Sequence, residues 1–175
     1  IRAGHKLSKE LGFQLISSQP QYSALWRVIE AEVVPTCKEL GVSQIVWSPM
    51  AQGVLTGKYK PGQPAPEGSR GSDERLGGMM GKYLSDEVLN RVQQLEPLAQ
   101  ALNLTMAQFA LAWVLQNDNV ASAIVGATKP EQISSNIEAV GVEIPADVMK
   151  QVSEILAPVA VFDPRETKSP EARLV

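Results

Sequence analysis

Three short β-like runs alternate with longer helical patterns along the chain, and this alternation constrains the fold most. The runs lie at 13–18, 44–47 and 123–125. Strands that alternate with helices form βαβ units, in which the strands are parallel and the helices cover the sheet. A parallel sheet needs cover on both faces or closure into a barrel. Because three short strands are too few for either, we expect an α/β fold that is the later part of a repeating β/α architecture.

Apolar spacing and capping residues predict the helices between these runs. Thr105 with Gln108, and Thr128 with Glu131, have the spacing of a capping box, and Pro97 is expected to break the helix that contains it. Helical patterns are expected at 2–11, over 24–40, after Ser85, after Thr105, after Thr128 and over 145–156.

Residues 50–84 are rich in glycine and include Pro61, Pro64 and Pro66. Such a long irregular segment inside a compact domain is often a functional loop, and we call 50–84 the lid loop. We expect 1–158 to form one structural unit, with an extra C-terminal helix, and 159–175 to be a tail that lies on its surface.

Composition excludes several classes of function. A formal net charge of −3 provides no general attraction to nucleic acid or to anionic membranes. No apolar run approaches the roughly 20 residues that span a bilayer, so no membrane insertion is expected. The single cysteine, Cys37, excludes an intrachain disulfide and a cysteine-cluster metal site, and is expected to be buried and inert. The single histidine, His5, is expected on the surface. No leader is visible, so we expect a cytoplasmic location.

Ligands of β/α folds bind at the carboxyl ends of the strands, in the loops that follow. After the third run, Gly126 allows close approach of a ligand to the backbone, Thr128 offers a hydroxyl, and Lys129 offers a cation. The following helix adds free N–H groups, so the segment resembles a phosphate site. The alternative is an ordinary strand-to-helix turn with an exposed lysine.

The other two strand ends carry further candidates. After the second run, Trp47 could stack on a flat ring, and Lys58 and Arg70 could hold a pyrophosphate. After the first run, the amide of Gln19 could pair with a ring amide such as that of nicotinamide. The alternatives are a core tryptophan, solvated cations and a structural glutamine.

Taken together, these segments resemble those of the aldo-keto reductase family. The matching stretches are Gln19 to Tyr22 (QPQY), Trp47 to Tyr59 (WSPMAQGVLTGKY), Thr105 to Trp113 (TMAQFALAW) and Ile124 to Asn136 (IVGATKPEQISSN). The tryptophan at position 47 most resembles the residue found there in the subgroup of potassium-channel β-subunits and their bacterial relatives. The resemblance implies the C-terminal part of a (β/α)₈ TIM barrel that binds NADPH and reduces aldehydes or ketones, with a small-molecule carbonyl substrate and possible homo-oligomers.

The resemblance also implies a role for individual residues. Gln19 would bind the nicotinamide carboxamide, and Trp47 would stack on the nicotinamide ring. Lys58 and Arg70 would hold phosphates from the lid loop, and the hydroxyl and cation at 128 and 129 favour NADP over NAD. Ser135 departs from a glutamate common in the subgroup. The remaining implied contacts are Ser48, Met50 and Gly53 along the pyrophosphate and Gly126, Thr128, Lys129, Gln132 and Asn136 at the adenosine end.

A further departure is the absence of segments that match the family's catalytic Asp, Tyr, Lys and His, which belong to earlier strands of the barrel. We therefore expect the chain to be the cofactor-binding half of an NADPH-dependent reductase, without catalytic residues or a metal and inactive by itself. One alternative is a cofactor-sensing regulatory or binding subunit of the potassium-channel β-subunit type. Another is a self-standing three-layer α/β domain of unrelated function.

Overall fold

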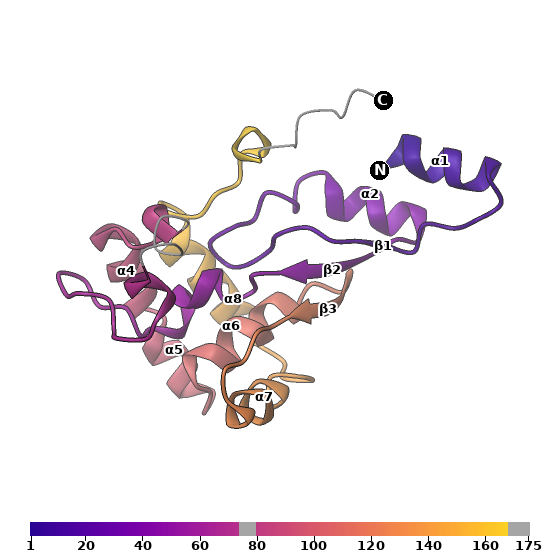
Figure 1. Ribbon diagram of the computed structural model, residues 1–175. Coiled ribbons are helices and arrows are strands. Elements are labelled where there is room, and N and C mark those ends of the chain that lie inside the picture. The colour runs from indigo at the N-terminus through magenta and orange to yellow at the C-terminus, as the bar shows by residue number, and fades with distance from the viewer. Residues whose placement is uncertain (74–79, 168–175) are drawn as a thin grey trace.

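A three-stranded parallel sheet lies at the centre of the computed structural model, which describes residues 1–73 and 80–167 (Figure 1). The strands are β1 (Ser17–Ser18), β2 (Ser43–Trp47) and β3 (Val120–Ile124), in the order β1-β2-β3. Trp47 is in register with Ile124, so the ends of β2 and β3 are adjacent. The expected parallel α/β arrangement is confirmed. The first strand is shorter than the predicted 13–18, because its ladder with β2 begins only where Ser17 meets Ser43.

The helices match most of the predicted positions. They are α1 (Arg2–Glu10), α2 (Val33–Leu40), α4 (Asp86–Gln93), α5 (Glu96–Ala101), α6 (Met106–Leu115), α7 (Pro130–Ile137) and α8 (Ala146–Leu156). The break between α4 and α5 comes where Pro97 was expected to cause it, and Pro97 lies in the first turn of α5, where its missing N–H costs no hydrogen bond. Short 3₁₀ turns in the lid loop and tail are η1 (Ala51–Thr56), η2 (Arg70–Ser72), η3 (Gly81–Tyr83) and η4 (Pro164–Glu166).

The helix predicted over 24–40 is wrong in its first half. Residues 24–32 form turns, and only Val33–Leu40 is helical, ending at Gly41 in the left-handed conformation (φ 68°). The C-terminal segment forms hydrogen bonds with backbone groups in this first half, which are then not available for a helix. Arg27 N–H donates to the Val161 carbonyl (2.8 Å), and Val161 N–H donates to the Leu25 carbonyl (3.0 Å). This pairing places the start of the expected tail against the loop after β1.

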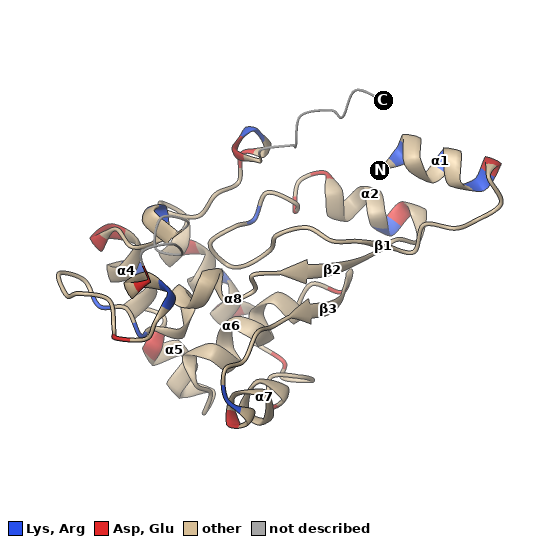
Figure 2. Ribbon diagram, in the orientation of Figure 1, with Lys and Arg blue, Asp and Glu red and all other residues tan. Residues whose placement is uncertain are grey.

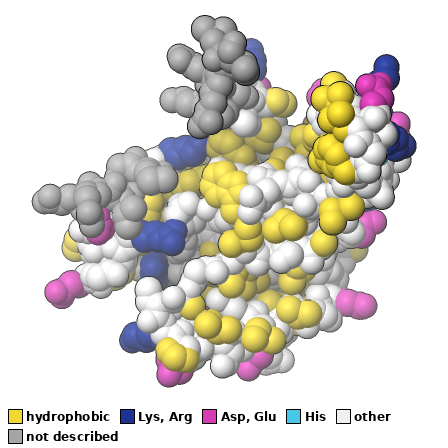
Figure 3. Space-filling view, turned by 45° about the vertical axis from the view of Figure 1, so that its right-hand side comes forward, with side chains coloured by type: hydrophobic (Ala, Val, Ile, Leu, Met, Phe, Trp, Pro, Cys, Tyr) yellow, Lys and Arg dark blue, Asp and Glu magenta, His cyan; other side chains and the backbone are white. Residues whose placement is uncertain are grey.

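One face of the sheet is packed against helices and the other is open in the described part of the chain. Gln44 and Val46 are fully buried, and β2 contacts α2 while β3 contacts α6 (Figure 1). On the opposite face, the side chains of Trp47 and Ile124 are 40% and 42% exposed. The strands carry no Lys, Arg, Asp or Glu (Figure 2). Figure 3 shows hydrophobic side chains distributed widely over one face of the molecule.

The packing of α1 and α2 shows that one expectation was wrong and confirms another. His5 is buried, contrary to the surface position expected from its sequence, because α1 packs on α2 and turns the face with His5 and Ser8 inward. Cys37 on α2 is fully buried and is a free thiol, as expected. Residues 74–79 of the lid loop and 168–175 of the tail lie outside the described residues.

Candidate functional site

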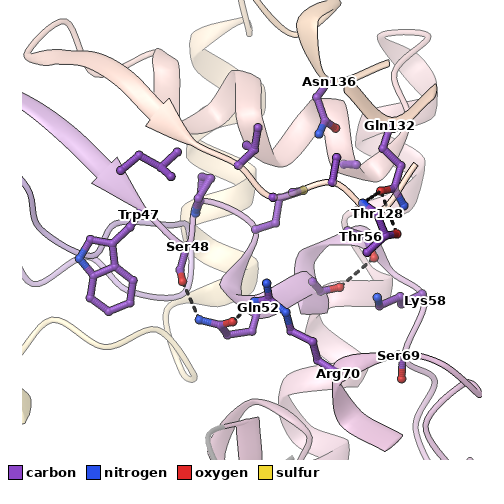
Figure 4. A pocket seen from close by; sticks show the side chains of 18 of the residues that line it. Trp47, Ser48, Gln52, Thr56, Lys58, Ser69, Arg70, Thr128, Gln132 and Asn136 are labelled. Atoms are coloured by element: carbon purple, nitrogen blue, oxygen red, sulfur yellow. Dashed lines mark hydrogen bonds between the residues drawn. The ribbon is translucent and has the colours of Figure 1, made fainter. Parts of the chain in front are cut away.

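A pocket of about 600 Å³ opens at the carboxyl ends of β2 and β3, between the lid loop and the start of α7 (Figure 4). Gln19 and Lys129 are outside its lining, although Lys129 adjoins the lining residue Thr128. The residues expected from sequence that do line it are Trp47, Ser48, Met50, Gly53, Lys58, Arg70, Gly126, Thr128, Gln132 and Asn136. The fold therefore gathers side chains from segments nearly 90 positions apart in the chain into one cavity.

Trp47 stands at one end of this pocket and the polar residues of α7 stand at the other (Figure 4). Two hydrogen bonds fix the backbone of Trp47 to the loop after β1, because its N–H donates to the Pro20 carbonyl (3.1 Å) and its carbonyl accepts from Tyr22 N–H (3.2 Å). The indole is 40% exposed and faces the open side of the sheet. It is therefore free to contact a flat ring, and it is not the core tryptophan of the alternative interpretation.

The loop after β2 follows an unusual backbone path. Ser48, Ala51 and Gln52 all have positive φ (55°, 46° and 59°), a region that side chains other than glycine adopt at a cost. Gly53 follows with φ 95°, and a Cβ there would lie 3.3 Å from both Cε and Nζ of Lys58. A side chain at position 53 would therefore meet the lysine that the loop packs against.

Two cations of the lid loop face the pocket, Lys58 and Arg70 (Figure 4). Neither forms an ion pair with a carboxylate among the described residues. Arg70 reaches across the cavity, because its Nη2 lies 3.9 Å from the position a Cβ would take at Gly126. Two uncompensated cations in one cavity favour an anionic ligand, and a guanidinium is suited to phosphate oxygens.

The start of α7 is closed by a glutamine. The Oε1 atom of Gln132 accepts from the N–H groups of Thr128 (2.7 Å) and Lys129 (3.3 Å) and from the Thr128 hydroxyl (3.3 Å). The predicted capping box of Thr128 with Glu131 is wrong, because the helix begins one residue later, with Lys129 at the N-cap and Gln132 three residues on. The box predicted for Thr105 and Gln108 is confirmed.

Sequence reasoning missed several residues that line this pocket. Ser69 precedes Arg70 and lines the pocket, and its buried Oγ has no hydrogen-bond partner in the described chain. Gln52 donates to Ser48 Oγ (2.6 Å) and accepts from Arg70. The other lining residues without an assigned role are Pro49, Thr56, Gly68, Ala107, Ile124, Val125 and Ala127. Only the adjacency of Ser69 to Arg70 could have indicated its position. Ser135, where the subgroup often has a glutamate, accepts from Gln108 through both its carbonyl and its hydroxyl.

Two buried tyrosines lie beside the loop after β1. Burial raises the pKa of Tyr22, and the charge of Glu30, to which its hydroxyl donates (2.8 Å), raises it further. Burial also raises the pKa of Tyr83, whose hydroxyl accepts from Gln21 (3.1 Å). Both phenols therefore stay protonated at neutral pH.

Residues 1–73 and 80–167 contain no group of three or more His, Cys, Asp or Glu arranged to hold a metal ion. No single helix in these residues is long and apolar enough to cross a membrane. One pair of helical segments, Asp86–Ala101 and Met106–Leu115, has the necessary length and composition only when the two are taken together, and the pair is bent by 86°.

Comparisons with known proteins agree with the resemblance seen in the sequence. Residues 2–157 match the sequence profile of the Aldo/keto reductase family. Among curated proteins, a "Probable voltage-gated potassium channel subunit beta" of Arabidopsis thaliana is 42% identical over 73% of this chain and 39% of its own length. A protein of the same name from Oryza sativa subsp. japonica is 39% identical over 88% of the chain and 46% of its own length. The "L-glyceraldehyde 3-phosphate reductase" of Escherichia coli (strain K12) is 35% identical over 77% and 39%. The chain thus spans less than half the length of these relatives.

Proposed function

The chain belongs to the aldo/keto reductase family, and on this premise we propose that it is the cofactor-binding half of an NADPH-dependent reductase of aldehydes or ketones. The observation that carries the proposal is the pocket at the ends of β2 and β3. It extends from an exposed indole at Trp47, past the cations Lys58 and Arg70, to the polar start of α7. A ring surface, a cationic section and a polar end, in that order, suit a dinucleotide bound in an extended form.

The residues present fit such a cofactor. The buried and unpaired Oγ of Ser69 lies in the pocket wall beside Arg70, where a phosphate oxygen or a bridging water would satisfy it. Lys58 and Arg70 are free of carboxylates in the described chain, so their charge is available to the diphosphate. Trp47 would orient the nicotinamide by contact with its ring, with Gln19 at its carboxamide as the resemblance implies. At the other end, Thr128, Gln132 and Asn136 would hold the adenosine.

When bound, NADPH supplies a hydride for a carbonyl carbon. This chain would bind the dinucleotide, fix the plane of its ring and exclude water from the diphosphate. The proton donor would be the Tyr among the family's catalytic Asp, Tyr, Lys and His, which no segment of this sequence matches. On this proposal those residues belong to the first half of a (β/α)₈ barrel, which would cover the open face of the sheet, and the isolated chain would show no turnover.

The preference for NADPH over NADH is proposed to depend on Lys129. Its backbone is held by Gln132 next to Thr128, and its side chain is exposed. A Lys129→Glu variant of the complete protein should lose affinity for NADPH more than for NADH, because repulsion of the 2′-phosphate replaces attraction. Tryptophan fluorescence or calorimetric titration would measure both affinities. Lys150→Glu, on the exposed side of α8, is the matched control and should change neither. Equal losses for both cofactors would refute the role of Lys129.

The proposed activity is tested by NADPH oxidation with a panel of aldehydes and ketones, followed through the absorbance of the reduced nicotinamide. The complete protein should turn over, and a Lys58→Met/Arg70→Met variant should bind NADPH more weakly. Absence of NADPH binding by the complete protein would refute the proposal.

A second candidate function is a cofactor-sensing regulatory subunit. It is favoured by the similarity to plant proteins named as probable potassium channel β-subunits. Copurification of the complete protein with a channel domain, changing with the NADPH to NADP⁺ ratio, would support it. Retention of reductase activity with no channel binding would favour the enzyme. The cytoplasmic location and homo-oligomers remain predictions.

A further inference from the structure

The side chain of Gln52 connects two parts of the pocket that the sequence keeps apart. Its Nε2 donates to the hydroxyl of Ser48 at the end of β2 (2.6 Å), and its Oε1 accepts from Nη1 of Arg70 in the lid loop (Figure 4). Both ends of the amide are therefore used. Gln52 therefore holds Arg70, which lies 18 positions further along the chain, against the end of β2.

The backbone at this point is maintained at a cost. Gln52 itself has φ 59°, and its neighbours Ser48 and Ala51 also have positive φ. Such a conformation persists where surrounding contacts over-determine it, and several such residues together are typical of ligand sites. Glycine would relieve the strain at position 52 but would offer no amide. We therefore attribute the presence of glutamine at this strained position to the contacts that its side chain makes.

Gln52 also determines which part of Arg70 is available. One terminal nitrogen, Nη1, is occupied by the amide, while Nη2 extends toward the loop after β3 and lies 3.9 Å from where a Cβ of Gly126 would be. Gly126 leaves that space open. The guanidinium is therefore fixed across the pocket with one edge directed toward a ligand between the two loops.

We propose that Gln52 is a positioning residue that holds Arg70 across the pocket so that its guanidinium binds a phosphate group of the dinucleotide. This inference rests on the proposed function and adds a residue to it. A neutral amide orients the guanidinium without neutralising it, so the full positive charge remains for the ligand. A carboxylate at the same place would pair with Arg70, would lose the donor to Ser48, and would compete with the phosphate.

The test uses the complete protein and measures NADPH affinity and dissociation rate for three variants. Gln52→Gly removes the amide while suiting the positive φ, so it should fold. It should weaken binding about tenfold, the equivalent of one charge-assisted hydrogen bond. Gln52→Glu should weaken binding at least as much, and part of the loss should be recovered as pH falls and the new carboxylate is protonated. Gln63→Gly, at an exposed glutamine of the same loop outside the pocket, is the control and should bind as the wild type.

A double-mutant cycle separates positioning from a structural role. If Gln52 acts through Arg70, Gln52→Gly should cause no further loss in an Arg70→Gln background. The kcat at saturating NADPH should be unchanged in Gln52→Gly while the KM for NADPH rises. Additive losses, or an unchanged affinity in Gln52→Gly, would overturn this inference alone. Failure of the wild type to bind NADPH would overturn the proposed function as well.

Discussion

Arg27 connects the loop after β1 to the C-terminal part of the chain, and its replacement should destabilise the protein far more than the loss of a surface arginine. Its Nε donates to both carboxylate oxygens of Glu30 (2.9 and 3.0 Å), and its Nη1 donates to Ser153 on α8 (3.0 Å). Its guanidinium lies 5.2 Å from the ring centres of both Trp113 and Phe162. One side chain therefore joins the loop, α6, α8 and the tail.

The magnitude follows from the partial burial of this cluster. The side chains of Arg27 and Glu30 are 17% and 28% exposed. Breaking a buried pair costs about 3–5 kcal/mol and breaking a surface pair about 0.2–1 kcal/mol, so about 2 kcal/mol suits this intermediate pair. Two contacts with aromatic faces add about 0.5 kcal/mol each. Arg27→Met, which keeps the length and apolar stem, should therefore lower the free energy of unfolding by about 3 kcal/mol. That is a large part of a typical stability of about 5–15 kcal/mol.

The assay is urea unfolding of the complete protein, with the slope m checked for constancy. Arg165→Met is the matched control. Arg165 is 89% exposed, and its ion pair in the described part of the chain is with its near neighbour Asp163 (2.6 Å), so the change should cost less than about 1 kcal/mol. An Arg27→Met/Glu30→Gln double variant should cost less than the sum of its single variants. A loss below about 1 kcal/mol for Arg27→Met, or one equal to the control, would refute the reasoning.

Three other predictions concern the lid loop, a helix start and pH. Gly71→Ala would place a Cβ 2.8 Å from the buried Tyr59 ring and should destabilise the protein by about 1–3 kcal/mol. Gly81→Ala, where a Cβ meets no described atom within 4 Å, should not, and melting temperatures compare the two. Thr105→Ala should cost about 1 kcal/mol by removing the N-cap of α6, and Thr105→Ser should retain it; equal unfolding midpoints for both would refute the capping role. Because burial raises the pKa of Tyr22 above its ordinary value of 10.0, the folded state keeps this proton longer than the unfolded state. The stability from this effect is complete below pH 10.0 and lost as pH rises beyond it, so unfolding midpoints should fall with alkaline pH less steeply in Tyr22→Phe than in the wild type.

Much of the site could be predicted from sequence because its signals are local. Trp47 and Gly126 each follow a strand, and parallel strands bring their carboxyl ends to one edge of a sheet. The pocket at that edge was therefore expected from strand positions alone, together with Lys58 and Thr128 in the loops that follow. The Thr105 cap was equally accessible, because a capping box involves residues only three positions apart.

Other features depend on contacts between distant parts of the chain. Residues 24–32 have a helical pattern but form turns, because their backbone pairs with Val161, more than 130 positions away. His5 is buried only because α1 packs on α2. Ser69 and Gln52 belong to no recognisable motif. They line the pocket because the lid loop packs against the end of β2, where Arg70 contacts Gln52.

The order of strands and helices along the chain, the parallel sheet and the edge at which the pocket lies were thus predictable from the sequence. These follow from periodicity, caps and strand ends, which are properties of neighbouring residues. Contacts between distant segments determine which side chains meet across the pocket, and they pair the backbone of residues 25 and 27 with the C-terminal segment in place of a helix. Such contacts depend on the free energy of bringing distant segments together, and this free energy cannot be inferred from any short stretch of sequence.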